Sequence, residues 1–338
     1  MTPRQKIDAI IALMVPEIRD AFLLAMSLIT DSVVIAELSA AIEAGDFERV
    51  YTLLNITGPV FRPMQTALES TYERIAEAEV NGFPARIKTP FGSMVFRFNM
   101  YDPNVVAYLR NQSGNLITAI QDDTRTTIRN TVADGQQSGR NPRSIALDIV
   151  GRIDPTTGKR VGGVVGLTKQ QEMWSRSVRK KLEALDPTYL EMALRDARFD
   201  GVVRKAIEAG KALSTDTIDK LVLRYREKAL KYRGEMIARN EVVPTANGAG
   251  YEAVRQVVAT GGVKAGAVTR EWDDVGDNRT RHDHRTMRGQ TVGLDEPFVA
   301  PDGSLLMFPG DDSLGASAKE VIMCRCRVKN LVDWAYDL

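Results

Sequence analysis

The residues of this chain that could bind a metal or move protons lie close together near its C-terminal end. The sequence contains only two histidines and only two cysteines. All four fall within residues 272–326, as His282-x-His284 and Cys324-x-Cys326. Imidazole and thiolate are the preferred ligands of zinc, and four of them make a closed tetrahedral structural site. If each pair lies on a strand, residues i and i+2 share a face, so neighbouring strands could present all four side chains to one ion.

Two versions of this site are open. A structural zinc ion could use His282, His284, Cys324 and Cys326, or His284 and the two cysteines alone. The alternative is that no metal is bound: His284 would then hydrogen-bond a nearby cluster of aspartate and arginine, and the cysteines would be small buried core residues.

That cluster suggests a second kind of chemistry. Asp277, Arg279 and Arg281 precede His284 at short intervals. A carboxylate beside a histidine, with arginines to clamp a phosphate, could serve a metal-dependent nuclease or a related hydrolase. The chain has neither a Gly-x-x-x-x-Gly-Lys phosphate loop nor a Gly-x-Ser-x-Gly elbow. We therefore favour structural ion pairing, with the hydrolase as the alternative.

Charge is distributed unevenly along the chain. The net charge is +1, but residues 1–80 hold twelve acidic and six basic residues, whereas residues 176–233 hold fifteen basic and nine acidic ones. Such asymmetry suggests separate partners for the two regions. The basic region could contact DNA phosphates without reading sequence, or it could be a solvated helical surface that pairs with its own carboxylates. The candidate DNA contacts are Arg179, Lys180, Lys181, Arg204, Lys205, Arg224 and Lys228.

The composition, with 43% hydrophobic and 26% charged residues among 338, is that of a soluble globular protein. Two cysteines one residue apart cannot form a disulfide framework, so reduced thiols and synthesis inside a cell are expected. The most apolar stretch, 21–30, is far shorter than the roughly 20 residues that a membrane span requires. We expect no membrane contact during assembly.

The rest of the chain supplies the elements that must position these residues. Apolar residues at helical spacing predict helices over 1–80, and Pro16 is expected to kink or split the first of them. The Gly- and Thr-rich residues 154–166 predict a loop or hairpin. A long helix is expected from Thr215 to about Glu241, with a separate helix beyond Ala246. A period-two pattern that begins near Val268 predicts strands.

The predicted fold is mainly α, with a helical N-terminal domain and a small α+β C-terminal domain. The predicted parts are an acidic helical N-terminal domain (1–81), a linker with a short strand or hairpin (82–100), a helical region with a basic face (101–262) and a small α+β end domain that carries the Asp/Arg/His and Cys-x-Cys motif (263–338).

Several spaced residues toward the C-terminal end occur in a specific order: Ala238-Arg239-Asn240-Glu241, Trp272, Asp277-x-Arg279-x-Arg281-x-x-His284, Gly289, Phe298, Pro309-Gly310 and Cys324-Arg325-Cys326. This order resembles the phage head-morphogenesis family, the Mu F-like minor head proteins of tailed bacteriophages. The resemblance covers roughly residues 100–330 and is best after 230. The chain departs from the family in having Asn240 where threonine is more common, and in the additional His282.

The resemblance implies a structural minor head protein of the virion and no enzyme. Such a protein is made in the cytoplasm of the bacterial host and lies inside the capsid. Its partners are the portal protein and coat or scaffold proteins, together with nonspecific contacts to the packaged double-stranded DNA, and its role is in head assembly, DNA packaging or DNA delivery. The residues expected to tie the end domain together are Trp272, Asp277, Arg279, Arg281, His284, Gly289 and Arg325.

Overall fold

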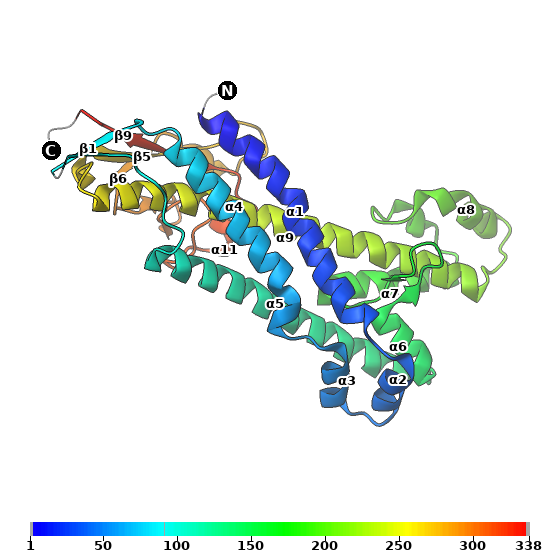
Figure 1. Ribbon diagram of the computed structural model, residues 1–338. Coiled ribbons are helices and arrows are strands. Elements are labelled where there is room, and N and C mark those ends of the chain that lie inside the picture. Colours follow the sequence, from blue (N-terminus) through cyan, green and yellow to red (C-terminus); the bar gives the residue numbers. More distant parts are fainter. Residues whose placement is uncertain (1–2, 91, 336–338) are drawn as a thin grey trace. The chain divides into compact units, whose positions relative to one another are not determined.

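The structure is a computed structural model that describes residues 3–90 and 92–335 (Figure 1). Helices dominate and the strands are short and concentrated toward the C-terminus, which confirms a mainly α fold with a small α+β C-terminal part. The α-helices are α1 (Pro3–Asp31), α2 (Ile35–Glu43), α3 (Phe47–Leu54), α4 (Arg62–Val80), α5 (Pro103–Gln137), α6 (Pro142–Val150), α7 (Lys169–Glu183), α8 (Asp200–Glu208), α9 (Thr215–Ala259), α10 (His282–Thr286) and α11 (Ala318–Val321). The strands are β1 (Ile87–Thr89), β2 (Gly92–Met94), β3 (Arg152–Ile153), β4 (Arg160–Val161), β5 (Val268–Asp273), β6 (Thr291–Gly293), β7 (Phe298–Val299), β8 (Leu305–Leu306) and β9 (Arg327–Val332).

The chain forms two compact units, and each unit combines segments that are distant in sequence. The first contains Met1–Arg19, Gln65–Ser113 and Glu235–Leu338, and the second contains Asp20–Met64 and Gly114–Gly234. The four longest helices, α1, α4, α5 and α9, each contribute residues to both units. The boundaries predicted at 81, 100 and 262 therefore do not coincide with this division, because a long helix can belong to two cores.

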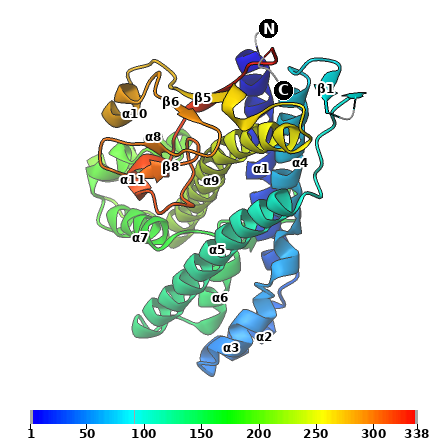
Figure 2. The ribbon, with the colours of Figure 1, turned by 90° about the vertical axis from the view of Figure 1, so that its left-hand side faces the viewer.

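A three-stranded antiparallel sheet organises the C-terminal part of the first unit. Its strand order is β6-β5-β9, so β5 is central and pairs with β9 along its whole length. One side of this region packs on the last turns of α9, where Val254 and Val257 are fully buried with Ile87 of β1. Figure 2 shows α10, α11 and the short strands β6 and β8 grouped beside α9. The sheet thus supports the segment that carries the histidines and cysteines.

A buried arginine lies in the middle of the central strand. Arg270 is fully buried, and its guanidinium donates to the carbonyl oxygen of Gly293 and to those of Met307 and Glu296. The same group lies over the ring of Tyr251 at 4.8 Å. Arg270 therefore fastens β5 to the two loops that follow β6 and β8, because a buried cation must find such acceptors.

The second unit is built mainly on helices. Helix α2 packs against α6, and Arg226 of α9 forms a buried ion pair with Asp148 of α6 at 3.0 Å. Gly166, in the loop before α7, has a φ of +82°, and a methyl group added there would come within 2.4 Å of the Met26 sulfur. Only glycine suits that position, since both the backbone and the space exclude a side chain.

One expectation about helices was wrong, because the segments predicted as separate helices on either side of residue 244 are one helix, α9, with Pro244 inside it. Of the two outcomes expected at Pro16, the split does not occur, since α1 continues unbroken past this residue. A proline inside a helix costs about 3 kcal/mol, but the packing of the flanking residues offsets that cost: Met14 and Ile18 on either side of Pro16 are fully buried.

The loop regions agree better with the predictions. Strands β1 and β2 form the hairpin expected within 82–100, and β3 and β4 form a hairpin around the turn expected within 154–166. Within the described residues, no single helix is long and apolar enough to span a membrane; α1 and α2, bent by 77° at the break between them, satisfy that test only as a pair, by length and composition.

Candidate metal centre

A short helix and an irregular loop position the histidine and the cysteines. His284 lies on α10, and Cys324 and Cys326 lie in the loop between α11 and β9. Neither pair therefore lies on a strand, which was the condition under which all four side chains could face one ion. Residues two apart on a helix point about 200° apart, so His282 faces away from His284. The His282 side chain is 80% exposed and lies 3.5 Å from Asp283. The four-ligand version of the site is thus not the one that the structure forms.

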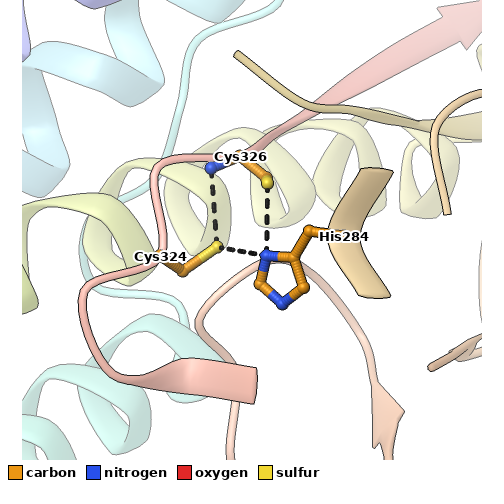
Figure 3. A group of neighbouring side chains, drawn as sticks. All are labelled: His284, Cys324 and Cys326. Atoms are coloured by element: carbon orange, nitrogen blue, oxygen red, sulfur yellow. Dashed lines mark hydrogen bonds between the residues drawn. The ribbon is translucent and has the colours of Figure 1, made fainter. Parts of the chain in front are cut away.

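The three remaining donors meet in the core. The His284 Nδ1 atom lies 3.6 Å from the Cys324 sulfur and 3.4 Å from the Cys326 sulfur (Figure 3). All three donor atoms lie within 4.8 Å of one another, and all three residues are buried. The Cys326 backbone N–H donates to the Cys324 sulfur at 3.4 Å. These are the residues of the three-ligand version.

The other ring nitrogen of His284 faces a carboxylate. Its Nε2 atom lies 2.8 Å from Glu320 of α11, which is fully buried. The ring also contacts Trp272 of β5 edge to face, with ring centroids 5.3 Å apart. The imidazole is thus enclosed on three sides: Nδ1 lies beside the sulfurs, and Nε2 lies in close contact with the acid, without the angles of a hydrogen bond.

These contacts shift the pKa values of the two thiols in opposite directions. The hydrogen bond with Cys326 and the adjacent His284 hold the pKa of Cys324 well below its usual value, although burial opposes this. The contact with Cys324, together with burial, raises the pKa of Cys326. Burial lowers the pKa of His284, but the contacts with Cys324 outweigh it and leave that pKa raised. Cys324 is therefore the thiol that more readily becomes a thiolate.

The aspartate and arginine residues form a separate group. Arg325 donates both of its terminal nitrogens to Asp277, at 2.8 and 2.7 Å, and this fork holds the pKa of Asp277 far below its usual value. Asp277 also accepts from the Arg279 backbone N–H at 3.1 Å, while the Arg279 side chain is exposed. Arg281 donates to the carbonyl oxygen of Ile322. Asp277 and His284 thus have different partners, and the cluster considered for a hydrolase is not assembled.

Gly289 closes the turn that returns the chain from α10 to the sheet. It has a φ of +76°, its backbone N–H donates to the Trp272 carbonyl at 2.9 Å, and the Trp272 backbone N–H donates to the Gln290 carbonyl at 2.9 Å. Trp272 itself is fully buried and packs on Phe298 as well as on His284. These residues connect the histidine to β5.

Comparison with known proteins finds a family model that matches the segment containing this site. Residues 197–329 match the model of the family described as phage Mu protein F like protein. Over this segment the chain is similar to the phage Mu protein F like family. The match supports a phage head-related protein and a location in the virion. Searches of curated proteins and of solved structures returned no match.

The Mu F-like segment contains the whole candidate centre and residues that sequence reasoning missed. Glu320 is one of them, because nothing in the sequence marks this acid as buried. Asn247 of α9 is the other, and it donates to the Cys326 carbonyl at 3.1 Å. Asn240, which the motif includes but to which no role was assigned, accepts from the Met323 backbone N–H at 3.0 Å. The two asparagines lie seven residues apart, so they share one helix face, and that spacing was the signal available for Asn247.

The motif residues on either side of Asn240 point to different neighbours. Arg239 pairs with Glu235 at 2.8 Å. Glu241 accepts from the side-chain amide of Gln112 at 3.2 Å. Arg239 and Glu241 therefore have different partners.

The seven candidate DNA contacts divide into three sets. Arg179, Lys181 and Arg224 are partly buried and pair with carboxylates, at 2.5, 3.3 and 2.9 Å. Lys228 is exposed and donates to the Arg195 carbonyl. Within the described part of the chain, the remaining three are exposed and form no ion pair; they are Lys180, Arg204 and Lys205.

Proposed function

We propose that this protein is a structural minor head protein that associates with the portal and the interior of the procapsid and aids head assembly or DNA delivery. The observation that carries the proposal is the Mu F-like segment, 197–329. The motif residues of this segment support a structural role, because Trp272 and His284 are buried in the core and Arg325 is locked to Asp277. Each holds one element of the segment to another.

Helix α1 offers a surface for such a partner. One side of it is core, with Met14, Ile18 and Phe22 fully buried. Three leucines on another side are exposed by 46–61%. Their spacing of eleven and four residues places them on one face of a helix, and an exposed apolar helix face fits a groove on a partner protein. We assign this face, Leu13, Leu24 and Leu28, to the portal.

Co-expression with the portal protein of the same phage tests the proposal. The full chain should co-elute with the portal in size-exclusion chromatography. The triple variant Leu13→Ser/Leu24→Ser/Leu28→Ser should lose most of that association while it keeps the helical circular-dichroism signal of the wild type. The matched control is Val299→Ser/Leu305→Ser/Leu314→Ser, which removes three exposed apolar side chains elsewhere. A full chain that elutes apart from a folded portal would contradict the proposal.

The geometry does not favour the hydrolase alternative. A general base or metal-bound carboxylate must reach substrate, but His284 is buried and both of its ring nitrogens face protein groups. Incubation of plasmid DNA with the protein and Mg²⁺, Mn²⁺ or Zn²⁺ should therefore leave the plasmid intact. Cleavage that His284→Ala abolishes would reverse this conclusion.

A further inference from the structure

We propose that His284 Nδ1 and the sulfurs of Cys324 and Cys326 bind one zinc ion, and that Glu320 holds the histidine in its ligand orientation. The proposal is independent of the head-protein function, because it rests only on the geometry of these four buried side chains.

The distances match a tetrahedral zinc site before any ion is added. Zinc lies about 2.3 Å from a thiolate sulfur and about 2.0–2.1 Å from an imidazole nitrogen. With tetrahedral angles at the metal, these bond lengths place a sulfur and a nitrogen about 3.6 Å apart. The two sulfur–nitrogen distances in the structure are 3.6 and 3.4 Å. The donors are therefore already spaced for the ion.

The donor set selects the kind of metal. Two soft thiolates and an imidazole favour zinc over magnesium or calcium, which prefer oxygen ligands. Two thiolates also neutralise the charge of a divalent ion in a buried place. Among the described residues, no fourth histidine, cysteine or acid joins the group. The fourth position therefore falls to a solvent oxygen.

Glu320 has the position of a supporting carboxylate. When a metal binds one ring nitrogen of a histidine, the other nitrogen keeps its proton and commonly donates it to a carboxylate, which fixes the ring. The Nε2 atom of His284 lies 2.8 Å from Glu320, and that acid is fully buried. Its other oxygen lies 3.3 Å from the Lys319 amine. A buried acid in this place is costly unless it serves such a partner.

The ion would join elements that are short or irregular. His284 comes from α10, the cysteines from the loop before β9, and Glu320 from α11. A bound metal would hold these three pieces against Trp272 of β5. Because the ligands come together only in the folded chain, binding free energy adds to folding free energy.

Metal analysis of the full chain, purified without chelators under reducing conditions, tests the site. Inductively coupled plasma mass spectrometry should find about one zinc per chain. His284→Ala and Cys326→Ser should lose it, whereas His282→Ala, a histidine change on the same short helix, should retain it. A wild-type chain that neither contains zinc nor takes up one equivalent would overturn the proposal, and so would loss of zinc from His282→Ala.

Two measurements on folded protein keep the test decisive if the ligand variants unfold. Zinc-edge X-ray absorption of the wild type should show two sulfur neighbours at about 2.3 Å and two lighter neighbours at about 2.0–2.1 Å; three or more sulfurs would contradict the ligand set. Glu320→Gln should keep one zinc but bind it about 10–100-fold more weakly in competition with a chromophoric chelator. The control is Glu271→Gln, an acid on β5 whose replacement should leave the affinity for zinc at the wild-type value. Equal affinity of Glu320→Gln and the wild type would remove Glu320 from the site.

Discussion

Asn247 shows how one side chain of α9 supports the loop that carries the cysteines. Its amide nitrogen donates to the carbonyl oxygens of Pro309 and Cys326, at 2.9 and 3.1 Å. Its amide oxygen accepts from the backbone N–H of Val328 at 3.2 Å. The residue is buried, so water cannot replace these bonds if the amide is removed. A single polar group therefore satisfies three backbone groups on two different segments.

Replacement of Asn247 should destabilise the fold strongly. Asn247→Ala leaves two carbonyls and one N–H without a partner, and each such buried group costs about 1–3 kcal/mol. We expect the free energy of unfolding to fall by about 2–4 kcal/mol in chemical denaturation, since some of these groups will relax toward solvent. Asn278→Ala, at an exposed position, is the control and should change it by less than about 0.5 kcal/mol. Equal effects of the two variants would contradict the role assigned to Asn247.

The sequence identified some of these residues and not others for a chemical reason. Histidine and cysteine are rare in this chain, so their clustering indicated the three donors that meet in the core. Acids and amides are common, and only the tertiary structure shows that Glu320 and Asn247 are buried beside them. His282 was included because two residues on a strand share a face, whereas the chain here is a helix.

At the scale of elements, a buried group of charges joins α6, α7 and α9. Asp148 of α6 pairs with Arg226 of α9 at 3.0 Å and with Arg140 at 2.6 Å. Glu172 of α7 is almost fully buried beside this pair and contacts Arg176. Burial raises the pKa of Glu172 to about 7; Arg226 lowers that pKa and Asp148 raises it. The three helices therefore meet at a carboxyl group that resists ionisation.

The pH dependence of stability should reveal this group. The ordinary pKa is 4.5 and the folded value is about 7, so the folded chain keeps a proton at Glu172 that the unfolded chain loses above about pH 4.5. The stability of the wild type relative to Glu172→Gln should therefore fall as the pH rises from about 4.5 to 7. We expect a change of about 1–2 kcal/mol in denaturant titrations, since one pKa unit corresponds to about 1.4 kcal/mol and Arg176 offsets part of the effect. Glu183→Gln, an exposed acid on the same helix, should show no such trend, and a flat difference for Glu172→Gln would contradict the prediction.

Helices and strands were predictable where apolar residues recur at a regular spacing over many positions. They were less predictable where a single proline or a short segment determines where an element ends. The central strand β5 begins at Val268, where the period-two pattern was recognised. The continuity of α9 was not recognised, because a proline such as Pro244 usually ends a helix. In the structure, the residues after it, such as Ala249 and Ala253, are fully buried, and this packing keeps the helix continuous.

At the scale of the whole molecule, the excess of positive charge in 176–233 is only partly available to a partner. Arg226 and Arg233 are buried in the second unit and pair with acids of that unit. Arg179 and Arg224 also have carboxylate partners. Thus much of the basic segment serves internal structure, and Lys180, Arg204 and Lys205 remain as candidates for contact with packaged DNA.

Affinity for DNA should depend on those three residues. The variant Lys180→Ala/Arg204→Ala/Lys205→Ala should weaken binding to nonspecific double-stranded DNA and lower the salt dependence of log K by about 0.9 for each phosphate that the variant no longer neutralises. Fluorescence anisotropy at several salt concentrations measures both. The control Lys6→Ala/Lys88→Ala/Lys264→Ala removes the same charge from exposed lysines of the first unit and should bind as the wild type does. An equal weakening in both variants would mean that only net charge matters.

The organisation into two units could not be predicted from sequence. Composition changes and Pro/Gly-rich segments mark contiguous stretches, and they suggested boundaries at 81, 100 and 262. The actual units are assembled from parts of the same long helices, α1, α4, α5 and α9. Which part of a helix joins which core depends on contacts between distant segments, and no local pattern encodes them.

The measurement that tests the central claim most directly is the location of the protein in particles of the phage or prophage that encodes it. Quantitative mass spectrometry of purified, DNA-filled heads should find the chain in a fixed ratio to the portal. The chain should resist external protease until the heads are opened. Its absence from the heads, or complete digestion by protease on intact heads, would contradict the account of an internal minor head protein.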